Sequence, residues 1–295
     1  MAEIAIGTAG WSYRDWEGIV YPRSERDKLR FLARYVDRIE IDTTFYRIPA
    51  PETVQSWHAR TADFPGFRFT AKLHQIFTHG PGFGPADIRA FHAAMEPLSA
   101  NGRLSHLLAQ FRWDFVDDAA ARRRLAELKA AFGDLAVFTL ELRHASWQQD
   151  RALDYLRTLG VTLANLDYPL AGNSFSLPVT GIGEHAYLRL HGRNTAAWFD
   201  SKAGRDQAYN YCYGGSELDG ILQRVVEIAQ RAKSVTLVAN NHYQGKAVLN
   251  ALELKGAIAG RKVDAPADLV RAYPRLAAIV REAGDGAPRQ GELGL

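Results

Sequence analysis

The sequence is very poor in cysteine, and Cys212 is its single one. A chain with one cysteine cannot form an intrachain disulfide, which excludes the disulfide-stabilised secreted scaffolds and fits a reducing compartment. No apolar run approaches the roughly 18 residues that a membrane helix needs. The N-terminal stretch MAEIAIGTAGW has neither the basic region nor the apolar core of a signal peptide. We therefore expect a cytoplasmic protein that does not enter the membrane.

A strong charge imbalance is also lacking, because 36 Lys and Arg face 33 Asp and Glu, giving a formal net charge of +3. No large basic field favours non-specific binding of nucleic acid, which is the less favoured partner. The mildly basic pI of about 8.9 favours a small anionic or phosphorylated substrate instead. The sequence leaves the number of subunits open.

No glycine-rich linker and no internal repeat divides the chain, and short strand-like segments alternate with helical ones. The strand-like segments are 4–8, 38–42, 67–72, 104–111, 136–142, 161–167, 185–192 and 234–241. The helical patterns are 27–36, 51–62, 86–98, 117–132, 148–159, 216–233 and 244–258. Such alternation is typical of parallel βαβ units.

Eight such units predict an α/β fold with a single (β/α)₈ TIM-type barrel over residues 1–283. The segment after the sixth strand looks non-helical, so we expect an irregularity there. A helix-like stretch beyond residue 262 predicts a C-terminal helical extension, and residues 284–295 read as a polar, flexible tail. A doubly wound open sheet is the alternative, but the sequence GTAGW is not a dinucleotide-binding fingerprint, and no organic cofactor motif is present.

The strands carry polar residues on one face only, which the segment VFTLELR shows well. Phe138, Leu140 and Leu142 alternate with Thr139, Glu141 and Arg143, and successive side chains of a strand point to opposite faces. In a barrel the aliphatic face lies under the helices, so the polar face points inward. The same pattern places further polar residues inward, namely Glu40, Asp42, Thr70, Lys72, His74, Gln110, Asn165, Asp167, Tyr187, Arg189, His191 and Asn240 or Asn241.

These inward residues concentrate at the carboxyl ends of the strands, where barrel enzymes carry their active sites. Buried charges must pair with one another or bind a ligand. We expect Glu141 to act as general base, with His191 as a second candidate for proton transfer and Glu40 beside them. Lys72, Arg143 and Arg189 would stabilise negative charge.

Paired glycines follow the seventh strand in YNYCYGGSELDGIL, where Gly214 and Gly215 precede Ser216 at the start of a predicted helix. Free N–H groups at a helix start favour an anion, and barrels commonly bind phosphate after strands seven and eight. The alternative is that Ser216 and Asp219 simply cap the helix.

Aromatic residues are also common after the predicted strands. Trp11, Trp16, Trp113, Trp147 and Trp198 lie there, joined by Tyr13, Tyr209, Tyr211 and Tyr213. Such rings suit stacking on a sugar or a base, although about half of them would merely seal the barrel.

A divalent metal is the less favoured cofactor, because no compact HxH or HExxH spacing is present and the inward lysine and arginines would repel a dication. No metal ligand is therefore assigned. A metal-dependent phosphodiesterase or endonuclease-like hydrolase acting on nucleic acid remains an alternative function. A nucleotide- or RNA-binding module without catalysis is another.

The sequence resembles the YecE-like proteins, a domain of unknown function family with a TIM barrel. The resemblance rests on IGTAGWSYRDWEG, EIDTTFYRIP, FRFTAKLHQIFTH, ELRHASW, YLRLHG, YGGSE and NNHYQGKAVLNA. It implies functional roles for Trp11, Glu40, Phe45, Tyr46, Lys72, Thr78, His79, Glu141, Arg143, His144, Arg189, His191, Gly214, Gly215 and Asn241. The chain departs from the family pattern in having QFRWDF in place of a QLPP-like turn, and NNHYQG in place of an NND-like stretch.

The resemblance adds confidence in the barrel but no established activity, since fold does not settle function. Together the residues predict an enzyme of the hydrolase or isomerase class. Its substrate would carry phosphate and a sugar or nucleotide, with His79 or His191 as acid, and with Trp11, Tyr13, Tyr46, Asn240 and Asn241 among the binding residues.

Overall fold

The computed structural model describes residues 2–200 and 202–281, and within them nine parallel strands form one nearly closed barrel. The order of the sheet is β6-β5-β4-β3-β2-β1-β9-β8-β7. The strands are β1 (Glu3–Ala9), β2 (Arg38–Ile41), β3 (Arg68–Lys72), β4 (Leu104–Gln110), β5 (Val137–Glu141), β6 (Thr162–Leu163), β7 (Asn165–Asp167), β8 (His185–Leu190) and β9 (Ser234–Ala239). The predicted TIM-type barrel is confirmed.

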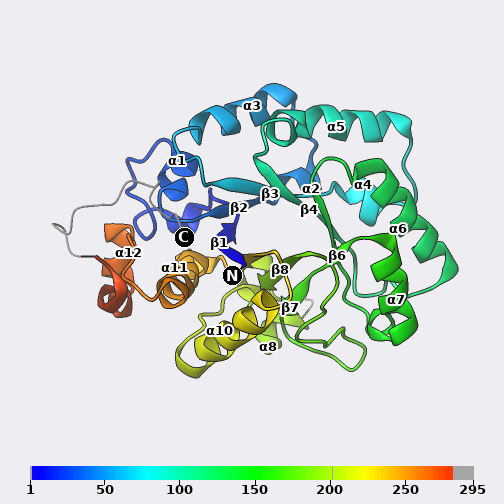
Figure 1. Ribbon diagram of the computed structural model, residues 1–295. Helices are drawn as coiled ribbons and strands as arrows, with labels where there is room; N and C mark the ends of the chain where they lie inside the picture. The colour runs from blue at the N-terminus through cyan, green and yellow to red at the C-terminus, as the bar shows by residue number, and fades with distance from the viewer. Residues whose placement is uncertain (1, 201, 282–295) are drawn as a thin grey trace.

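Helices surround the strands, which lie in the middle of the molecule (Figure 1). The longer ones are α1 (Lys28–Ala33), α3 (Pro51–Arg60), α5 (Pro85–Ser99), α6 (Ala119–Phe132), α7 (Asp150–Leu159), α10 (Gly215–Ala229) and α11 (Lys246–Ala259). Each of these lies where its hydrophobic pattern predicts a helix. Short helices lie in the loops that follow strands: η1 (Arg14–Trp16), α2 (Thr43–Tyr46), α4 (Gln75–Thr78), η2 (Ala145–Gln148), α8 (Thr195–Trp198), α9 (Arg205–Ala208) and η3 (Tyr243–Gly245).

The predicted sixth strand is split, and β6 pairs only with β5 while β7 pairs only with β8. The cause is that the segment before β8 forms hydrogen bonds with β6 and β7. The Leu163 N–H donates to the Ile182 carbonyl, and the Thr180 N–H donates to the Asn165 side chain. The segment between β7 and β8 therefore takes up bonds that a neighbouring strand would otherwise make, and it contains no helix in the described chain, as the sequence predicts.

The core has two parts, one between the strands and the helices and one inside the barrel. Phe138 and Leu140 on β5 are buried in the large apolar cluster under the helices. The inward residue Thr139 instead contacts His106 of β4, 2.9 Å from Nδ1 to Oγ1. The predicted assignment of the two faces of β5 is thus confirmed. Gly7 of β1 allows β1 and β2 to approach, since a Cβ there would lie 1.8 Å from the Arg38 carbonyl oxygen.

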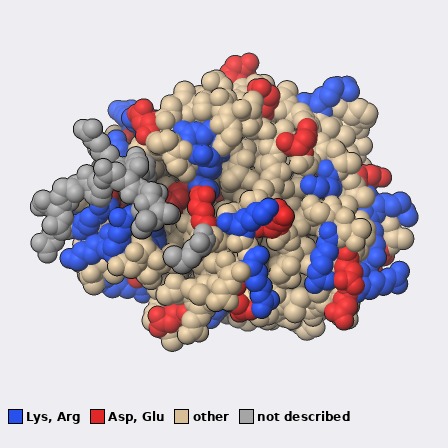
Figure 2. Space-filling model, viewed as in Figure 1, with Lys and Arg blue, Asp and Glu red and all other residues tan. Residues whose placement is uncertain are grey.

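The C-terminal extension contains α12 (Ala267–Ala272) and η4 (Pro274–Ile279), which pack beside α11 (Figure 1). Leu269 and Leu276 are fully buried in this contact. The predicted tail 284–295 lies outside the described residues. Within the described part of the chain, no helix is long and apolar enough to cross a membrane. Lysines, arginines and acids are interspersed over the face shown in Figure 2, in keeping with the small net charge.

Candidate active site at the carboxyl ends of the strands

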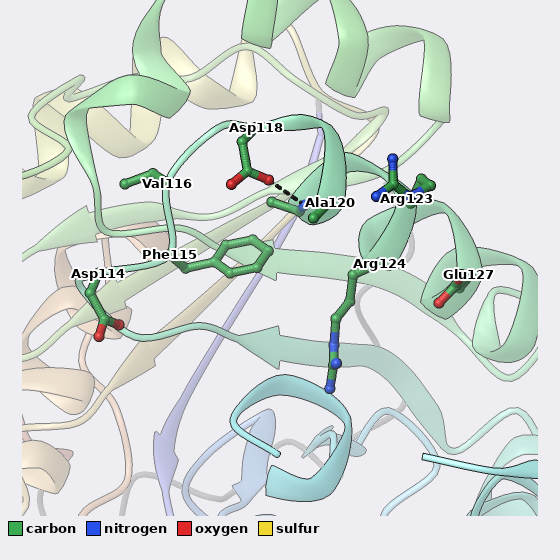
Figure 3. A pocket seen from close by; sticks show the side chains of 9 residues that line it. Asp114, Phe115, Val116, Asp118, Ala120, Arg123, Arg124 and Glu127 are labelled. Carbon is green, nitrogen blue, oxygen red and sulfur yellow. Dashed lines mark hydrogen bonds between the residues drawn. The ribbon is translucent and has the colours of Figure 1, made fainter. Parts of the chain in front are cut away.

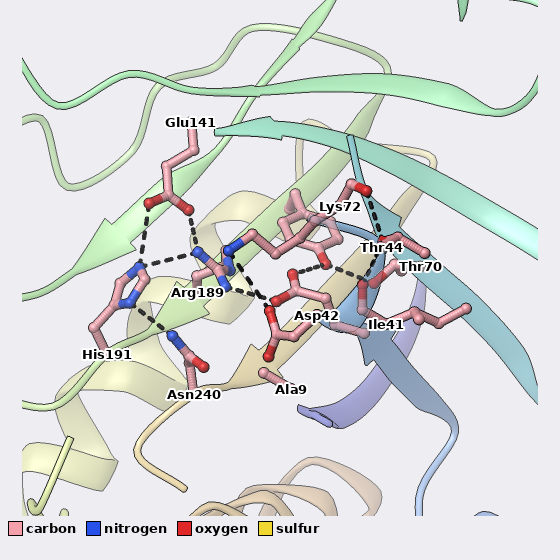
Figure 4. A network of polar contacts seen from close by, with 12 residues as sticks. Ala9, Ile41, Asp42, Thr44, Thr70, Lys72, Glu141, Arg189, His191 and Asn240 are labelled. Atoms are coloured by element: carbon pink, nitrogen blue, oxygen red, sulfur yellow. Dashed lines mark hydrogen bonds and ion pairs between the residues drawn. The ribbon is translucent and has the colours of Figure 1, made fainter. Parts of the chain in front are cut away.

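Arg189 of β8 is the centre of a buried ion network inside the barrel (Figure 4). Its Nη2 lies 2.6 Å from Oε1 of Glu40 on β2, and its Nη1 donates to Oε2 of Glu141 on β5. All three side chains are at most 1% exposed. Burial alone would lower the pKa of Arg189, but Glu141 and Glu40 raise it well above its usual value. Arg189 is therefore a fixed cation that binds two acids from different sides of the barrel.

Glu40 is also hydrogen-bonded by an inward residue of the barrel, Tyr187. Its Oε2 accepts a hydrogen bond of 2.8 Å from the Tyr187 hydroxyl, which also lies 2.8 Å from Thr70 Oγ1. Burial raises the pKa of Glu40 and outweighs the attraction to Arg189. All of these groups come from inward positions, so the alternation predicted from the sequence brings Glu40, Thr70, Tyr187 and Arg189 together as expected.

Both oxygens of Glu141 are occupied by cations. Arg143 donates to Oε1 from Nε at 2.9 Å and from Nη2 at 2.5 Å, while Arg189 takes Oε2. Burial would raise the pKa of Glu141, but Arg189 and Arg143 hold it well below its usual range. A carboxylate with such a low proton affinity is a weak general base. The general-base role expected for Glu141 stays a prediction, and the contacts of its carboxylate are with Arg143, Arg189 and His191.

His191 follows β8 and joins the same network. Its Nε2 lies 3.6 Å from Glu141 Oε1, and its Nδ1 lies 3.0 Å from the side-chain nitrogen of Asn240. Burial lowers the pKa of His191 to about 4, against the attraction of Glu141, so the ring is neutral at pH 7. The Asn240 amide donates to Nδ1, and Arg189 Nη1 lies 3.4 Å from Nε2, so both ring nitrogens face polar partners. Both residues take the inward positions that the sequence predicts.

Lys72 ends β3 and extends toward the same space (Figure 4). Its Nζ lies 3.7 Å from Asp42 Oδ1 and 4.4 Å from the centre of the Phe45 ring. Burial lowers the pKa of Lys72, and Arg189 adds to this effect. Lys72 accordingly has no tight carboxylate partner among the described residues, unlike Arg189.

His79 lies at the rim of the barrel, against Phe45 and close to several cations. Its ring centre is 5.0 Å from that of Phe45, and its Nδ1 is 2.8 Å from Thr78 Oγ1. Desolvation, followed by the charges of Lys72, Arg112 and Arg143, lowers the pKa of His79 to about 4. His79 is therefore an exposed imidazole that is neutral at pH 7.

Aromatic rings line one side of the opening. The Arg143 guanidinium lies 5.6 Å from the Trp198 ring, which is 5.7 Å from His191 and 5.8 Å from Tyr209. Tyr209 is in turn 5.1 Å from His242, and Tyr13 stacks on His242 at 4.4 Å. Tyr13 thus joins this wall as the sequence predicts, and the wall continues from β8 to β9 and β1.

Other predicted aromatic and histidine residues lie elsewhere. Trp11 packs edge-on against Trp57 of α3 at 5.5 Å, and Tyr46 is 59% exposed beside Phe45. Trp147 is fully buried, with its indole N–H donating to the Phe115 carbonyl. His74, predicted to point inward, instead accepts from the Ile76 N–H and begins α4, so this prediction is wrong. The loop that follows β3 turns the backbone at this point and ends the alternation.

The paired glycines begin α10, with Gly214 as its first flanking residue and Gly215 and Ser216 inside the helix. The Gly214 N–H donates to the Glu217 carboxylate at 3.4 Å, and a Cβ at Gly214 would lie 3.3 Å from Arg275. The described contacts of these residues are with Glu217 and the C-terminal extension, rather than with the network around Arg189. Phosphate binding by the glycines stays a prediction, and the cap is provided by Glu217 rather than by the predicted Ser216 and Asp219.

Asn241 is buried below this region and belongs to a polar cluster of its own. Its side-chain nitrogen donates to the Tyr211 carbonyl and to Asn250 Oδ1, each at 2.9 Å. Asn250 also bonds the backbone of Tyr213. These bonds hold the loop before α10 against α11. Asn241 therefore supports this loop, whereas Asn240 contacts the ion network.

Two groups were missed by the sequence reasoning. The inward His106 of β4 is fully buried beside Tyr187, at 4.9 Å between ring centres, and its place in the alternation of LSHLLAQF would have revealed it.

Asp167 was found, but its partners were not. Arg193 binds both of its oxygens at 2.9 and 2.7 Å, and the Tyr213 hydroxyl donates at 2.7 Å. No sequence pattern links these three residues.

A shallow groove of about 390 Å³ lies at the start of α6, lined by residues that include Phe115, Val116 and Arg123 (Figure 3). Arg124 crosses it to bond the carbonyls of Phe77 and Gly80, which fixes the loop carrying His79. The groove supports the rim rather than forming the site.

Among residues 2–200 and 202–281, no three His, Cys, Asp or Glu side chains are grouped so that they could hold a metal ion.

Comparison with known proteins places the chain in a family. Residues 5–272 match the family described as Protein of unknown function DUF72. The Escherichia coli protein UPF0759 YecE is 32% identical over 98 residues, which cover 32% of this chain and 34% of YecE. The aligned part is thus about a third of that relative's length.

Crystal structures of two DUF72 family proteins resemble the whole barrel. The protein from Thermotoga maritima is 30% identical with a TM-score of 0.76, covering 87% of this chain and 99% of that one. The protein from Enterococcus faecalis is 26% identical with a TM-score of 0.77, covering 89% and 98%. None of these descriptions names an activity.

Proposed function

The chain belongs to the DUF72 family, and from the geometry of its site we propose that it is an enzyme acting on a phosphate-bearing, sugar- or nucleotide-containing substrate. The reaction is acid–base chemistry at the carboxyl ends of the barrel strands, of the hydrolase or isomerase class. The observation that carries this proposal is the arrangement of charge. The acids Glu40 and Glu141 are buried and bound by Arg189, while the side chains of Lys72 and Arg143 are 10% and 16% exposed.

The sign of the field at the opening supports an anionic substrate. Lys72, Arg112 and Arg143 lower the pKa of His79 against the opposing charge of Asp114, and three nearby cations favour an anion beside this ring. Arginines bind phosphate with two parallel hydrogen bonds, and they stay charged at every physiological pH. Arg143 is already held in place by Glu141, so an anion would bind it with little loss of side-chain entropy.

The residue that transfers protons to and from the substrate is His79, and His191 supports the site from a buried position. Both rings are neutral at pH 7, and a neutral imidazole can accept a proton at one nitrogen and donate from the other. His79 is exposed and can touch a substrate, whereas His191 is buried between Glu141 and the ring of Trp198. We assign His79 as the catalytic residue and His191, Glu141 and Glu40 as positioning residues.

The aromatic wall would receive the uncharged part of the substrate. Sugars and bases both stack on aromatic faces, and the wall of Trp198, Tyr209 and His242 lies next to Arg143. The phosphate and the ring of one small molecule would thus have adjacent partners.

The test is a turnover screen of sugar phosphates and nucleotides, each paired with its dephosphorylated counterpart. We expect turnover only of phosphorylated compounds, with a loss of about 10²-fold or more in His79→Asn, the scale typical of removing an acid–base group. His185→Asn is the matched control. His185 begins β8, at the end of the barrel away from the proposed site, and its ring bonds the Ser234 hydroxyl. Equal turnover of the neutral counterparts, or an unimpaired His79→Asn variant, would contradict the proposal.

A further inference from the structure

Resting on the proposed function, we propose that Lys72 is a nucleophile whose amine forms a Schiff base with a carbonyl carbon of the substrate. The substrate class is then narrowed to phosphate-bearing compounds with an aldehyde or ketone group, such as open-chain sugar phosphates. The geometry around Nζ carries this inference.

The Lys72 amine is largely buried and lacks a close polar partner among the described residues. Its side chain is 10% exposed, and within the described residues no hydrogen bond is made by Nζ, whose nearest carboxylate oxygen is 3.7 Å away on Asp42. Other lysines with acidic partners are bound tightly. Nζ to carboxylate distances are 2.7 Å for Lys28–Glu17, Lys233–Glu184 and Lys255–Asp37. An amine that reaches the opening without a hydrogen-bond partner is free to attack a bound substrate.

The surroundings of Lys72 favour loss of its proton. Burial lowers its pKa and the charge of Arg189 lowers it further, while Asp42, Glu40 and Glu141 act in the opposite direction. The two acids Glu40 and Glu141 are already bound by Arg189, which reduces their influence. Burial of lysine in a site of this kind is how enzymes obtain a nucleophilic amine at neutral pH. Arg143 remains charged, so anion binding does not require the lysine to be protonated.

The chemistry balances with the groups present. The lone pair of neutral Nζ attacks the carbonyl carbon, a C–N bond forms, and the carbonyl oxygen takes up a proton while Nζ releases one. The resulting hydroxyl leaves as water with one further proton, as the nitrogen lone pair forms the C=N bond of a protonated imine. Hydrolysis takes up one water, releases the proton and regenerates the carbonyl group and the neutral amine. We assign these proton transfers to His79, whose ring contacts Phe45 as the Lys72 amine does.

Among the other lysines, Lys246 is the natural control. It is the first residue of α11, its Nζ donates to Asn210 Oδ1, and it packs 5.2 Å from the Tyr243 ring. Burial lowers its pKa as well, so it is comparable to Lys72 in that respect. It differs in that its amine is hydrogen-bonded and outside the ion network.

The experiment treats the full chain with glycolaldehyde phosphate and sodium cyanoborohydride, which reduces an imine to a stable secondary amine. Peptide mapping by mass spectrometry then gives the rate of labelling at each lysine. We expect Lys72 to be labelled clearly faster than Lys246, because the Lys72 amine makes no hydrogen bond within the described chain, whereas the Lys246 amine donates to Asn210 Oδ1. Lys72→Met should lose the fast label, and Lys246→Met should keep it.

Labelling spread evenly over the surface lysines, with Lys72 no faster than Lys246, would overturn the inference. The wild-type map alone decides this, so the test holds even if Lys72→Met fails to fold. Failure of the two proposals is distinguishable. Turnover of a phosphorylated substrate without a trapped adduct would remove the covalent step alone, whereas equally fast labelling of Lys72 by phosphate-free glycolaldehyde would contradict the anion-binding part of the proposed function.

Discussion

The Arg189 guanidinium on β8 lies 2.6 Å from the Glu40 carboxylate on β2, and neither side chain has appreciable access to solvent. The two strands are not neighbours in the sheet, so this ion pair crosses the interior of the barrel. The same guanidinium binds Glu141 of β5. One arginine thus joins three strands and determines which charges are left at the opening.

Arg189→Met should destabilise the protein strongly, because Glu40 and Glu141 would remain buried without their cation. Breaking a buried pair by removing one partner costs about 3–5 kcal/mol. The measurement is the free energy of unfolding in urea. Arg157→Met is the control, since the Arg157–Asp154 pair is exposed and should contribute less than about 1 kcal/mol. Equal effects of the two substitutions would contradict the role of Arg189.

Buried histidines should make stability fall in mild acid. Burial lowers the pKa of His106 to about 3, whereas it is near 6.5 in the unfolded chain. Between these values the unfolded state binds more protons, so its relative free energy drops as pH falls. The expected loss is about 1.4 kcal/mol for each pH unit below 6.5. His106→Gln, which can still bond Thr139, should show a smaller loss between pH 7 and 4.5 in urea unfolding. Parallel curves for the two proteins would contradict this.

Gly7→Ala should be among the most damaging single substitutions in β1. A Cβ at this position would lie 1.8 Å from the Arg38 carbonyl oxygen, so β1 and β2 would have to separate. Overpacking in a tight interior commonly costs about 1–3 kcal/mol and occasionally more. Gly66→Ala is the matched control, because nothing lies within 4 Å of its added Cβ. Thermal unfolding of both variants would show the difference, and similar melting temperatures would contradict it.

The wall around Arg143 predicts a selective effect on binding. Trp198→Leu should weaken binding of a phosphorylated substrate that carries a ring, but leave binding of inorganic sulfate nearly unchanged, because only the ring stacks on Trp198. Base or sugar stacking on an aromatic side chain contributes about 1–3 kcal/mol. Isothermal titration with both ligands measures this. An equal loss for both would show that Trp198 acts only by holding Arg143.

The sequence was sufficient for most of the barrel, because strands and helices have different hydrophobic periods. The faces of β5 and β8 followed directly from alternation, and so did the inward positions of Glu40, Glu141 and Arg189. The split of the sixth strand was not predictable in detail, because it depends on Asn165 bonding Thr180 across a loop.

The full set of partners of Glu141 could not be predicted for a similar reason. Its neighbour Arg143 is visible in the sequence, but the partner that removes its basicity, Arg189, comes from 48 residues away. A carboxylate near one arginine can still serve as a base, whereas one held between two is a poor base. At Gly214, by contrast, the partner is close in the sequence. The Glu217 that caps the helix is visible in the motif GGSE, and phosphate binding by the paired glycines stays a prediction.

The most direct measurement for the central claim, an anion-binding site with a neutral histidine at the opening, is the pKa of His79 by NMR with and without sulfate. Without sulfate we expect a pKa of about 4, held down by desolvation and by Lys72, Arg112 and Arg143. Sulfate bound beside these cations should raise it, and Arg143→Met should weaken the sulfate dependence. A His79 pKa near 6.5 that sulfate leaves unchanged would contradict the account.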